Sequence, residues 1–401
     1  MDVSAALRAV ALTACLSLGC WHGPPSGPLL PVAVMPIDPY GGAIYVPGAV
    51  NGDSAWLMFD TGLTRTGIDR EWARTIGALA VTAPDGPAAP IGESVSRVVV
   101  NTLRVGSLEL PQYPVALYPL RGLSEASGRV QRGLVGHDLL QHFTVEIDYR
   151  ARLVRLFDPA RYRYAGPGTT VRFTPDADLP LLAASLRVAG RRPIPARLLL
   201  DTGASGLCLI LTEPFVEQHG LARLSPAIAA PIGTGLVGEL HGTIVRLQEL
   251  RLAGVKVRAP TTGLGGEKKG FLGRTDIDGV IGNAVFEGTR LIVDYARRRV
   301  IVEHHAAPRS RCDYDMSGLR LTARGPGLKR VMVDYVVPRS PGADVGIQPG
   351  DELLLIDGQG IAGRELSDVR DALRVAGAAR RLVLWRDADT IRVTLKLRRL
   401  L

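Results

Sequence analysis

A repeated motif constrains this chain more than any other feature of its sequence. Ala55–Gly62 and Ala196–Gly203 share the pattern Ala-x-Leu-apolar-apolar-Asp-Thr-Gly, and their aspartates lie 141 positions apart. Three further marks recur in the same order, 141 or 146 positions apart: Pro90-Ile91-Gly92 as Pro231-Ile232-Gly233, Gly133–Gly136 as Gly279–Gly282, and Asp148-Tyr149 as Asp294-Tyr295. Because the order is kept, residues 31–303 are predicted to form a duplicated domain of roughly 125 residues per copy.

Each copy is predicted to be mainly β. The chain of 401 residues contains 46 glycines and 28 prolines, which separate short apolar or alternating segments such as Val98–Val105, Val171–Phe173 and Thr243–Leu252. One short helix is expected after each motif, at Arg70–Ile76 and at Glu213–His219.

The motif itself places a carboxylate where a strand ends in a tight turn, because glycine adopts backbone conformations closed to other residues. A single Asp-Thr-Gly occurs by chance in roughly a tenth of chains this long, and each turn alone could be an Asx turn that caps its own backbone. Two copies at equivalent places of a repeat, Asp60–Gly62 and Asp201–Gly203, indicate a shared function.

The repeat resembles the retropepsin-like and pepsin-like aspartic proteases, specifically bacterial proteins with two retropepsin-like halves and a C-terminal PDZ module. The resemblance implies a mainly β, bilobal pseudo-dimer of two acid-protease β-barrel halves. It implies that Asp60 and Asp201 meet as the catalytic pair, with Thr61 and Thr202 cross-bracing the loops that contain Gly62 and Gly203. The segments after Pro90-Ile91-Gly92 and Pro231-Ile232-Gly233 would then form hairpin flaps.

Two carboxylates within hydrogen-bond reach cannot both ionise cheaply, so such a pair holds one proton over a range of pH. The ionised member can deprotonate a water while the protonated member donates to a peptide carbonyl, and no metal or organic cofactor is required. One position departs from the family pattern: Leu63 follows the first motif, where alanine, serine or threonine is usual.

The C-terminal part resembles PDZ domains over Val331–Gly358, and Glu365–Val375 suits the helix beside a PDZ groove. In that fold a peptide adds as a strand, and backbone N–H groups hold its terminal carboxylate. Gly318, Leu319, Arg320 and Leu321 are the candidate carboxylate loop, although Arg320 replaces a usual glycine. The alternative is that the module packs on the protease and binds nothing freely.

The resulting domain prediction begins with a signal peptide over residues 1–20. Protease-like halves follow at 31–160 and 168–303, then a linker at 304–315 and the PDZ domain at 316–400.

The N-terminus has the layout of a secretory signal, with Arg8 before the apolar stretch Ala9–Gly19. It is similar to a bacterial lipoprotein signal in which Cys20 or Cys15 would be lipidated, and an ordinary cleaved signal is the alternative. Export to the periplasm or cell envelope, with a lipid anchor in a membrane, is therefore expected.

The remaining charges and ligand-type residues indicate no further site. The net charge of +9 comes from scattered arginines without an aromatic ladder, which gives no support for nucleic-acid binding. No histidine has a metal-type spacing. A disulfide between Cys208 and Cys312 is allowed in an exported protein, but Cys208 is expected to be a small buried hydrophobe.

These observations lead to an aspartic endopeptidase that acts on a peptide or protein substrate, with a PDZ groove for C-terminal peptides. The rival hypothesis is a non-catalytic peptide-binding or sensor protein of the cell envelope on the same fold, and Leu63 is the feature that favours it.

Overall fold

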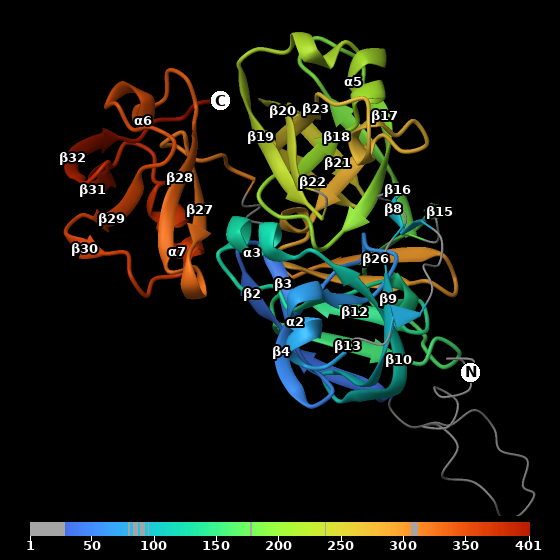
Figure 1. The fold of residues 1–401 in the computed structure, drawn as a ribbon. Coiled ribbons are helices and arrows are strands. Elements are labelled where there is room, and N and C mark those ends of the chain that lie inside the picture. The colour runs from blue at the N-terminus through green and yellow to red at the C-terminus, as the bar shows by residue number, and fades with distance from the viewer. Residues whose placement is uncertain are drawn as a thin grey trace, which may run out of the picture.

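The computed structural model describes residues 29–78, 81–82, 87–88, 93–94, 96–176, 179–236, 238–305 and 312–401 (Figure 1). The predicted signal segment at residues 1–20 and the flap motif at Pro90–Gly92 lie outside these residues. Among the helices described, none is long and apolar enough to cross a membrane.

The first protease-like half is a β-barrel, because strand β3 pairs with both β4 and β9. Its eight strands follow the order β2 (Asp38–Tyr40), β3 (Ala43–Val50), β4 (Asp53–Phe59), β11 (Gly133–Val135), β5 (Gly67–Asp69), β10 (Leu108–Tyr118), β9 (Arg97–Val105) and β6 (Val81–Thr82). Its other elements are the short pair β7 (Pro87–Ala88) and β8 (Glu93–Ser94), and the helices α2 (Arg70–Thr75), α3 (Arg121–Ser127) and α4 (His137–Leu140).

The second half repeats this arrangement. Its sheet has the order β19 (Ala227–Gly235), β20 (Gly238–Arg246), β23 (Thr261–Gly265), β18 (Leu209–Leu211), β24 (Gly279–Gly282), β17 (Ile194–Asp201), β16 (Leu179–Arg187), β21 (Glu249–Leu252) and β22 (Val255–Arg258), with β15 (Thr174–Asp176) beside β16 and helix α5 at Glu213–Gln218. Strand β24 runs parallel to β17 and antiparallel to β18, as β11 does to β4 and β5. The duplication seen in the sequence is therefore a duplication of topology.

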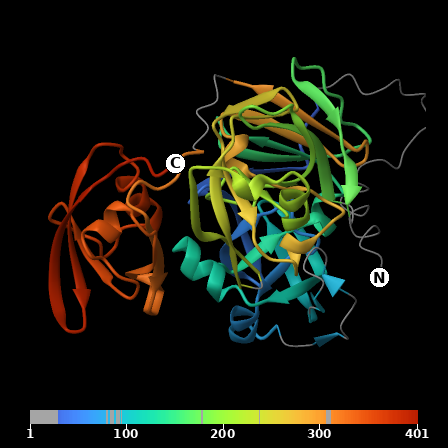
Figure 2. The same cartoon turned by 90° about the horizontal axis from the view of Figure 1, so that it is seen from above.

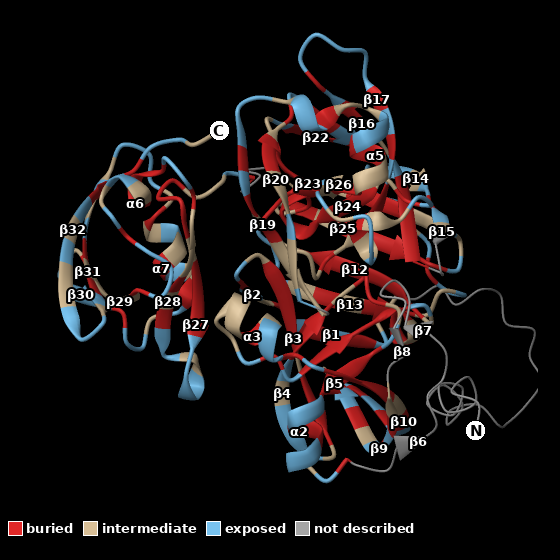
Figure 3. Ribbon diagram, turned by 45° about the horizontal axis from the view of Figure 1, so that its top comes forward, coloured by how far each residue is buried: buried red, intermediate tan, exposed pale blue. Residues whose placement is uncertain are grey.

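A third sheet joins the halves. Its order is β1 (Ala33–Pro36), β13 (Leu153–Phe157), β12 (Thr144–Asp148), β25 (Thr289–Asp294), β26 (Arg299–His304) and β14 (Thr169–Arg172). The halves meet where β12 pairs antiparallel with β25, with Glu146 opposite Ile292. Buried residues fill both barrels and this central sheet (Figure 3).

The C-terminal module is a separate sheet beside the protease-like halves (Figure 2). Its strand order is β27 (Leu319–Arg324), β28 (Arg330–Val336), β29 (Glu352–Ile356), β31 (Ala379–Arg386) and β32 (Asp389–Lys396), with β30 (Gln359–Gly360) beside β29 and the helices α6 (Pro341–Asp344) and α7 (Leu366–Ala372). It has its own core, in which Leu321, Leu353 and Val369 are buried.

Most of the predicted elements are present, and the differences have local causes. The helices predicted after each motif are α2 and α5, each within one residue of its predicted span. The single strand expected over Thr243–Leu252 is two strands, β20 and β21, because Leu247-Gln248 turns the chain from one partner to another. Strand β14 covers Thr169–Arg172 and so stops before Phe173.

Cys208 is buried as expected, but the disulfide that the sequence only allowed is present, so Cys208 is not a lone small hydrophobe. It forms this bond with Cys312, and the two Cα atoms are 5.5 Å apart. The fold brings Cys312 to this point by holding its segment against the second half, where the Thr261 hydroxyl donates to the Cys312 carbonyl over 2.9 Å.

Candidate active site

The two motif aspartates stand at equivalent strand ends. Asp60 directly follows β4, and its N–H donates to the carbonyl of Val135 on β11 over 3.0 Å. Asp201 is the last residue of β17 and lies opposite Gly282 of β24. The recurring segments Gly133–Gly136 and Gly279–Gly282 therefore form the strands that pair directly with those that carry the aspartates.

Reciprocal hydrogen bonds join the two motif loops. The Thr61 hydroxyl donates to Leu200 O over 2.9 Å, and the Thr202 hydroxyl donates to Phe59 O over 2.7 Å. Each hydroxyl also accepts the backbone N–H of the other threonine over 3.1 Å. Both threonines have no exposed surface, so the four bonds form in the interior and fix one loop against the other.

Each aspartate carboxyl rests on the glycine of the opposite loop. A Cβ added to Gly62 would lie 2.5 Å from the Asp201 Cγ, and one added to Gly203 would lie 2.5 Å from the Asp60 Oδ2. Only glycine leaves room for this approach. The geometry thus brings Asp60 and Asp201 together across the two halves, from positions 141 residues apart.

The environment raises the pKa of both carboxyls. Burial raises the pKa of Asp60 well above its usual value, and the charge of Asp201 and a hydrogen bond between the two carboxyls raise it further. Burial also raises the pKa of Asp201, although N–H donors from Gly203 and Ala204, each 2.8 Å from Oδ1, act against this rise. Both residues keep part of their surface exposed.

Leu63 fits its loop without distorting it. Its carbonyl accepts the His137 N–H over 2.7 Å, as the Ala204 carbonyl accepts the Asn283 N–H over 3.0 Å in the second half. The Leu63 side chain is buried in an apolar cluster with Tyr118 and other residues of the first half. The bulkier residue therefore changes the packing outside the loop and leaves the main-chain pattern in place.

Comparisons with known proteins agree with this geometry. Residues 46–139 match the family model described as aspartyl protease, and residues 332–386 match the model described as PDZ domain. The chain contains a retropepsin-like aspartyl protease domain and a PDZ domain. The curated proteins contain no match.

The solved structures that match include one that shares a short segment with the chain. It is titled photosystem II D1 C-terminal processing protease, and the match has 29% identity and a TM-score of 0.20. The match covers 20% of this chain and 22% of that protein, so this chain spans about a fifth of its length.

The two halves also contain polar contacts that the sequence did not reveal. Asn283 donates from Nδ2 to the Gly42 carbonyl over 2.9 Å and accepts the Tyr149 hydroxyl, which ties the second half to the first. Asp138 accepts the N–H and hydroxyl of Thr66 over 2.7 and 2.6 Å. In the sequence, Asn283 is marked only by its place directly after the repeated Gly-x-x-Gly segment of the second half, which is the place that His137 takes in the first half.

Pro231-Ile232-Gly233 lies within strand β19, which forms a hairpin with β20, so the hairpin begins before this motif and not after it. Next to its turn, Leu236 packs against the cluster of the first half that contains Leu63. The hairpin therefore reaches from the second half to the neighbourhood of the first motif, as the flap prediction requires.

The predicted carboxylate loop of the PDZ domain has an internal partner. Asp315 Oδ1 accepts the N–H groups of Ser317, Gly318 and Leu319 over 2.8, 2.6 and 3.3 Å. The side chain of Arg320 points to the protease domain, and Leu321 is buried in the PDZ core. Binding of a peptide by Gly318–Leu321 stays a prediction.

Across the described residues, no group of three or more His, Cys, Asp or Glu side chains could hold a metal ion.

Proposed function

We propose that the protein is an aspartic endopeptidase in which Asp60 and Asp201 activate a water molecule. The observation that carries the proposal is the pairing of the two carboxyls on opposite glycines within a cross-braced loop pair. An ordinary Asx turn would need neither the second motif nor the bonds between the loops.

The proposed reaction uses the single proton of the pair. The ionised carboxylate takes a proton from water, the water attacks the peptide carbonyl, and the protonated carboxyl donates to the carbonyl oxygen. The leaving nitrogen is protonated as the intermediate collapses. The proton belongs to the pair, so neither aspartate has a permanent acid or base role.

The raised pKa values set the direction of the pH dependence. Activity requires one proton on the pair, so it falls when both carboxyls are protonated at low pH and when both are ionised at high pH. Because burial raises both pKa values, the active window lies above that of two ordinary carboxyls.

A cleavage assay tests the proposal. Purified Trp21–Leu401 is incubated with a diverse peptide pool from acid to neutral pH, beside the Asp60→Asn and Asp201→Asn variants. We expect each variant to lose at least about 100-fold in rate, because general acid–base catalysis contributes about 10²- to 10⁴-fold. Asp53→Asn is the matched control, since Asp53 is exposed at the first position of β4.

The outcomes separate the hypotheses. Cleavage that survives either motif variant would assign the activity to another site or a contaminant. No cleavage by any folded form would favour the non-catalytic binding protein. The packing of Leu63 outside the loop, with the main-chain pattern kept, supports the enzyme over that rival.

We further propose that the chain is exported, with Cys20 or Cys15 as the site of a lipid anchor. The disulfide between Cys208 and Cys312 supports an oxidising compartment, since such bonds are rare where thiols are kept reduced. Mass spectrometry of the mature N-terminus tests this proposal: a lipidated cysteine would confirm the anchor, and an unmodified N-terminus after cleavage would indicate an ordinary signal.

A further inference from the structure

The groove edge of the PDZ domain faces the protease domain. Strand β27 is the last strand of its sheet and pairs with β28 alone. In PDZ domains, a peptide adds to this edge, between the strand and the helix beside it. Here helix α3 of the protease domain packs against β27, and Gly128 at its end lies so close to α7 that an added Cβ would be 2.4 Å from the Leu366 Cβ.

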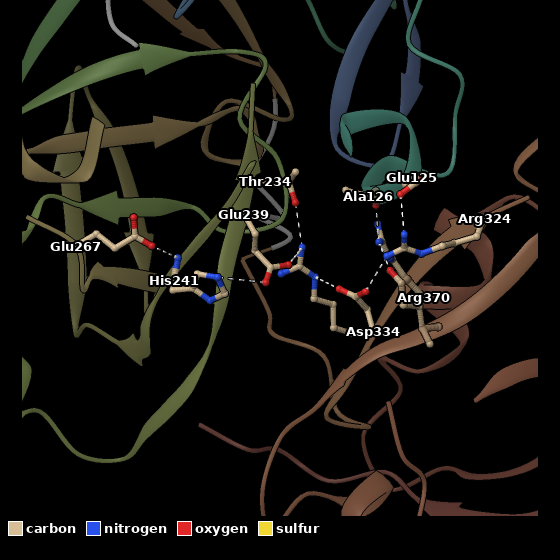
Figure 4. Close-up of polar contacts among 11 residues, drawn as sticks. Glu125, Ala126, Thr234, Glu239, His241, Glu267, Arg324, Asp334 and Arg370 are labelled. Atoms are coloured by element: carbon tan, nitrogen blue, oxygen red, sulfur yellow. Dashed lines mark hydrogen bonds and ion pairs between the residues drawn. The ribbon is translucent and has the colours of Figure 1, made fainter. Parts of the chain in front are cut away.

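Polar contacts hold α3 in this place (Figure 4). Arg370 of α7 donates from the same nitrogen to the carbonyl of Ala126 on α3 and to that of Leu321 on β27, each over 2.6 Å. Arg324 of β27 pairs with Glu125 of α3 over 2.9 Å. The end of α3 thus bonds to both the strand and the helix that border the groove.

The PDZ domain also holds the hairpin β19–β20. The Arg320 guanidinium contacts Glu239 Oε1 over 2.6 Å and donates to the Thr234 hydroxyl over 2.9 Å, on the two strands next to the hairpin's turn (Figure 4). The Tyr335 hydroxyl donates to the Ala229 carbonyl over 2.9 Å, nearer the base. Val337 packs with the apolar residues of the same hairpin. The domain therefore restrains the hairpin along its length.

We propose that α3 occupies the peptide groove of the PDZ domain, and that an acidic, extended peptide that displaces α3 releases the hairpin β19–β20. The charge of the ligand follows from the groove. Arg320, Arg324 and Arg370 each contact an oxygen of the protease domain. Within the PDZ domain, Arg320 and Arg324 also pair with Asp334, and Arg370 also donates to the Leu321 carbonyl. A peptide that removes α3 must replace the Glu125 carboxylate beside Arg324 and the Ala126 carbonyl beside Arg370, and acidic side chains can make both contacts with charge-assisted hydrogen bonds.

The terminal carboxylate of the ligand contributes little in this scheme. Asp315 already accepts the N–H groups at Gly318 and Leu319, so this anion site is filled by the chain itself. Recognition therefore depends on the acidic side chains and on strand addition to β27. The blocking of the groove by α3 and the restraint of the hairpin do not require that Asp60 and Asp201 be catalytic, so this inference can be tested separately from the proposed function.

The test uses the mature chain with Asp60→Asn, so that the probe is not cleaved. The probe is a fluorescein-labelled octapeptide of alternating Glu and Val, with an alternating Lys and Val peptide as its control. Binding is measured by fluorescence anisotropy, and opening of the hairpin by hydrogen exchange of residues 227–246. We expect the acidic probe to accelerate hairpin exchange at least about 10-fold and the Lys peptide to have no effect.

Charge-reversal variants identify the contact. Glu125→Arg opposes Arg324 and should raise both probe affinity and hairpin exchange about 10-fold. Arg330→Glu is the matched control, because Arg330 pairs with Glu352 within the PDZ sheet. Tyr335→Phe removes one hairpin contact with minimal change and should accelerate exchange near Ala229 alone.

Three results would overturn the inference. The first is a probe that binds while hairpin exchange stays unchanged. The second is a Glu125→Arg protein that matches the parent in both readouts although it is folded. The third is equal binding of the acidic and Lys probes. A free C-terminus that binds more than about 10-fold tighter than an amidated one would overturn the assignment of the anion site to Asp315.

Discussion

At the scale of single residues, the dyad is a source of instability as well as the proposed source of activity. Burial raises the pKa of both Asp60 and Asp201, and the charge of Asp201 raises the pKa of Asp60 further. A carboxyl whose folded pKa is raised stabilises the fold only while it keeps its proton, and that contribution is lost as pH rises through the folded pKa.

Asp60→Asn should therefore become more stable than the wild type as pH rises. Near pH 4 the two proteins should have similar free energies of unfolding. Above the raised pKa, the free energy of unfolding of the variant should be higher by on the order of 1 kcal/mol, and the variant should unfold at a higher urea concentration. Urea titrations from pH 4 to pH 8 measure the difference. The exposed Asp53→Asn should run parallel to the wild type at every pH. A constant gap between Asp60→Asn and wild type would contradict the linkage argument.

The sequence could predict the aspartates because their signal is local and repeated. Asp60 and Asp201 each stand in a short motif at the end of an apolar strand. Asn283 could not be found in this way, because its partners Gly42 and Tyr149 are 241 and 134 residues away and share no pattern with it. Such contacts depend on how the halves dock, which no local periodicity encodes.

At the scale of elements, the threonines make two loops into one unit. Thr202 contributes a hydroxyl that both accepts from the Thr61 N–H and donates to the Phe59 carbonyl. Its removal would leave a buried donor and a buried acceptor without partners, which costs about 1–3 kcal/mol for each group.

Thr202→Val should accordingly lose about 2–5 kcal/mol of unfolding free energy, and peptide cleavage should fall with it as the loops lose their register. Thr202→Ser is the matched variant, because it keeps the hydroxyl and loses one methyl, for about 1 kcal/mol. Chemical denaturation and the cleavage assay give both numbers. If the Thr202→Ser and Thr202→Val variants lose the same free energy of unfolding, the packing of the methyl group and not the hydroxyl holds the loops together.

The predictable elements are those with strong local signals. The helices at Arg70–Thr75 and Glu213–Gln218 follow turn and capping residues, and Asp69 caps the first by accepting the Glu71 N–H. The division of Thr243–Leu252 into two strands was not predictable, because it depends on pairing with β23 on one side and β16 on the other. The placement of α3 on β27 has the same origin in tertiary packing.

At the scale of the whole molecule, one covalent bond links the site region to the C-terminal domain. Cys208 lies a few residues after Asp201, and Cys312 lies a few residues before the PDZ strand β27. The bond spans 104 positions. It keeps the start of the PDZ domain next to the second half, where Arg320 and Tyr335 reach the hairpin β19–β20.

Replacing both cysteines, as Cys208→Ala with Cys312→Ala, should lower the unfolding free energy by about 4–5 kcal/mol, because the unfolded chain regains the entropy of a loop of about 100 residues. The same pair of substitutions should speed hydrogen exchange in residues 227–246, since the PDZ domain loses its anchor beside the hairpin. Reduction of the wild type by a thiol should reproduce both effects without any change in side-chain volume, which separates the lost bond from the smaller alanine. If the reduced wild type keeps its hairpin protection while its global stability falls, the disulfide stabilises the second half alone and the non-covalent contacts of Arg320 and Tyr335 suffice to hold the PDZ domain in place.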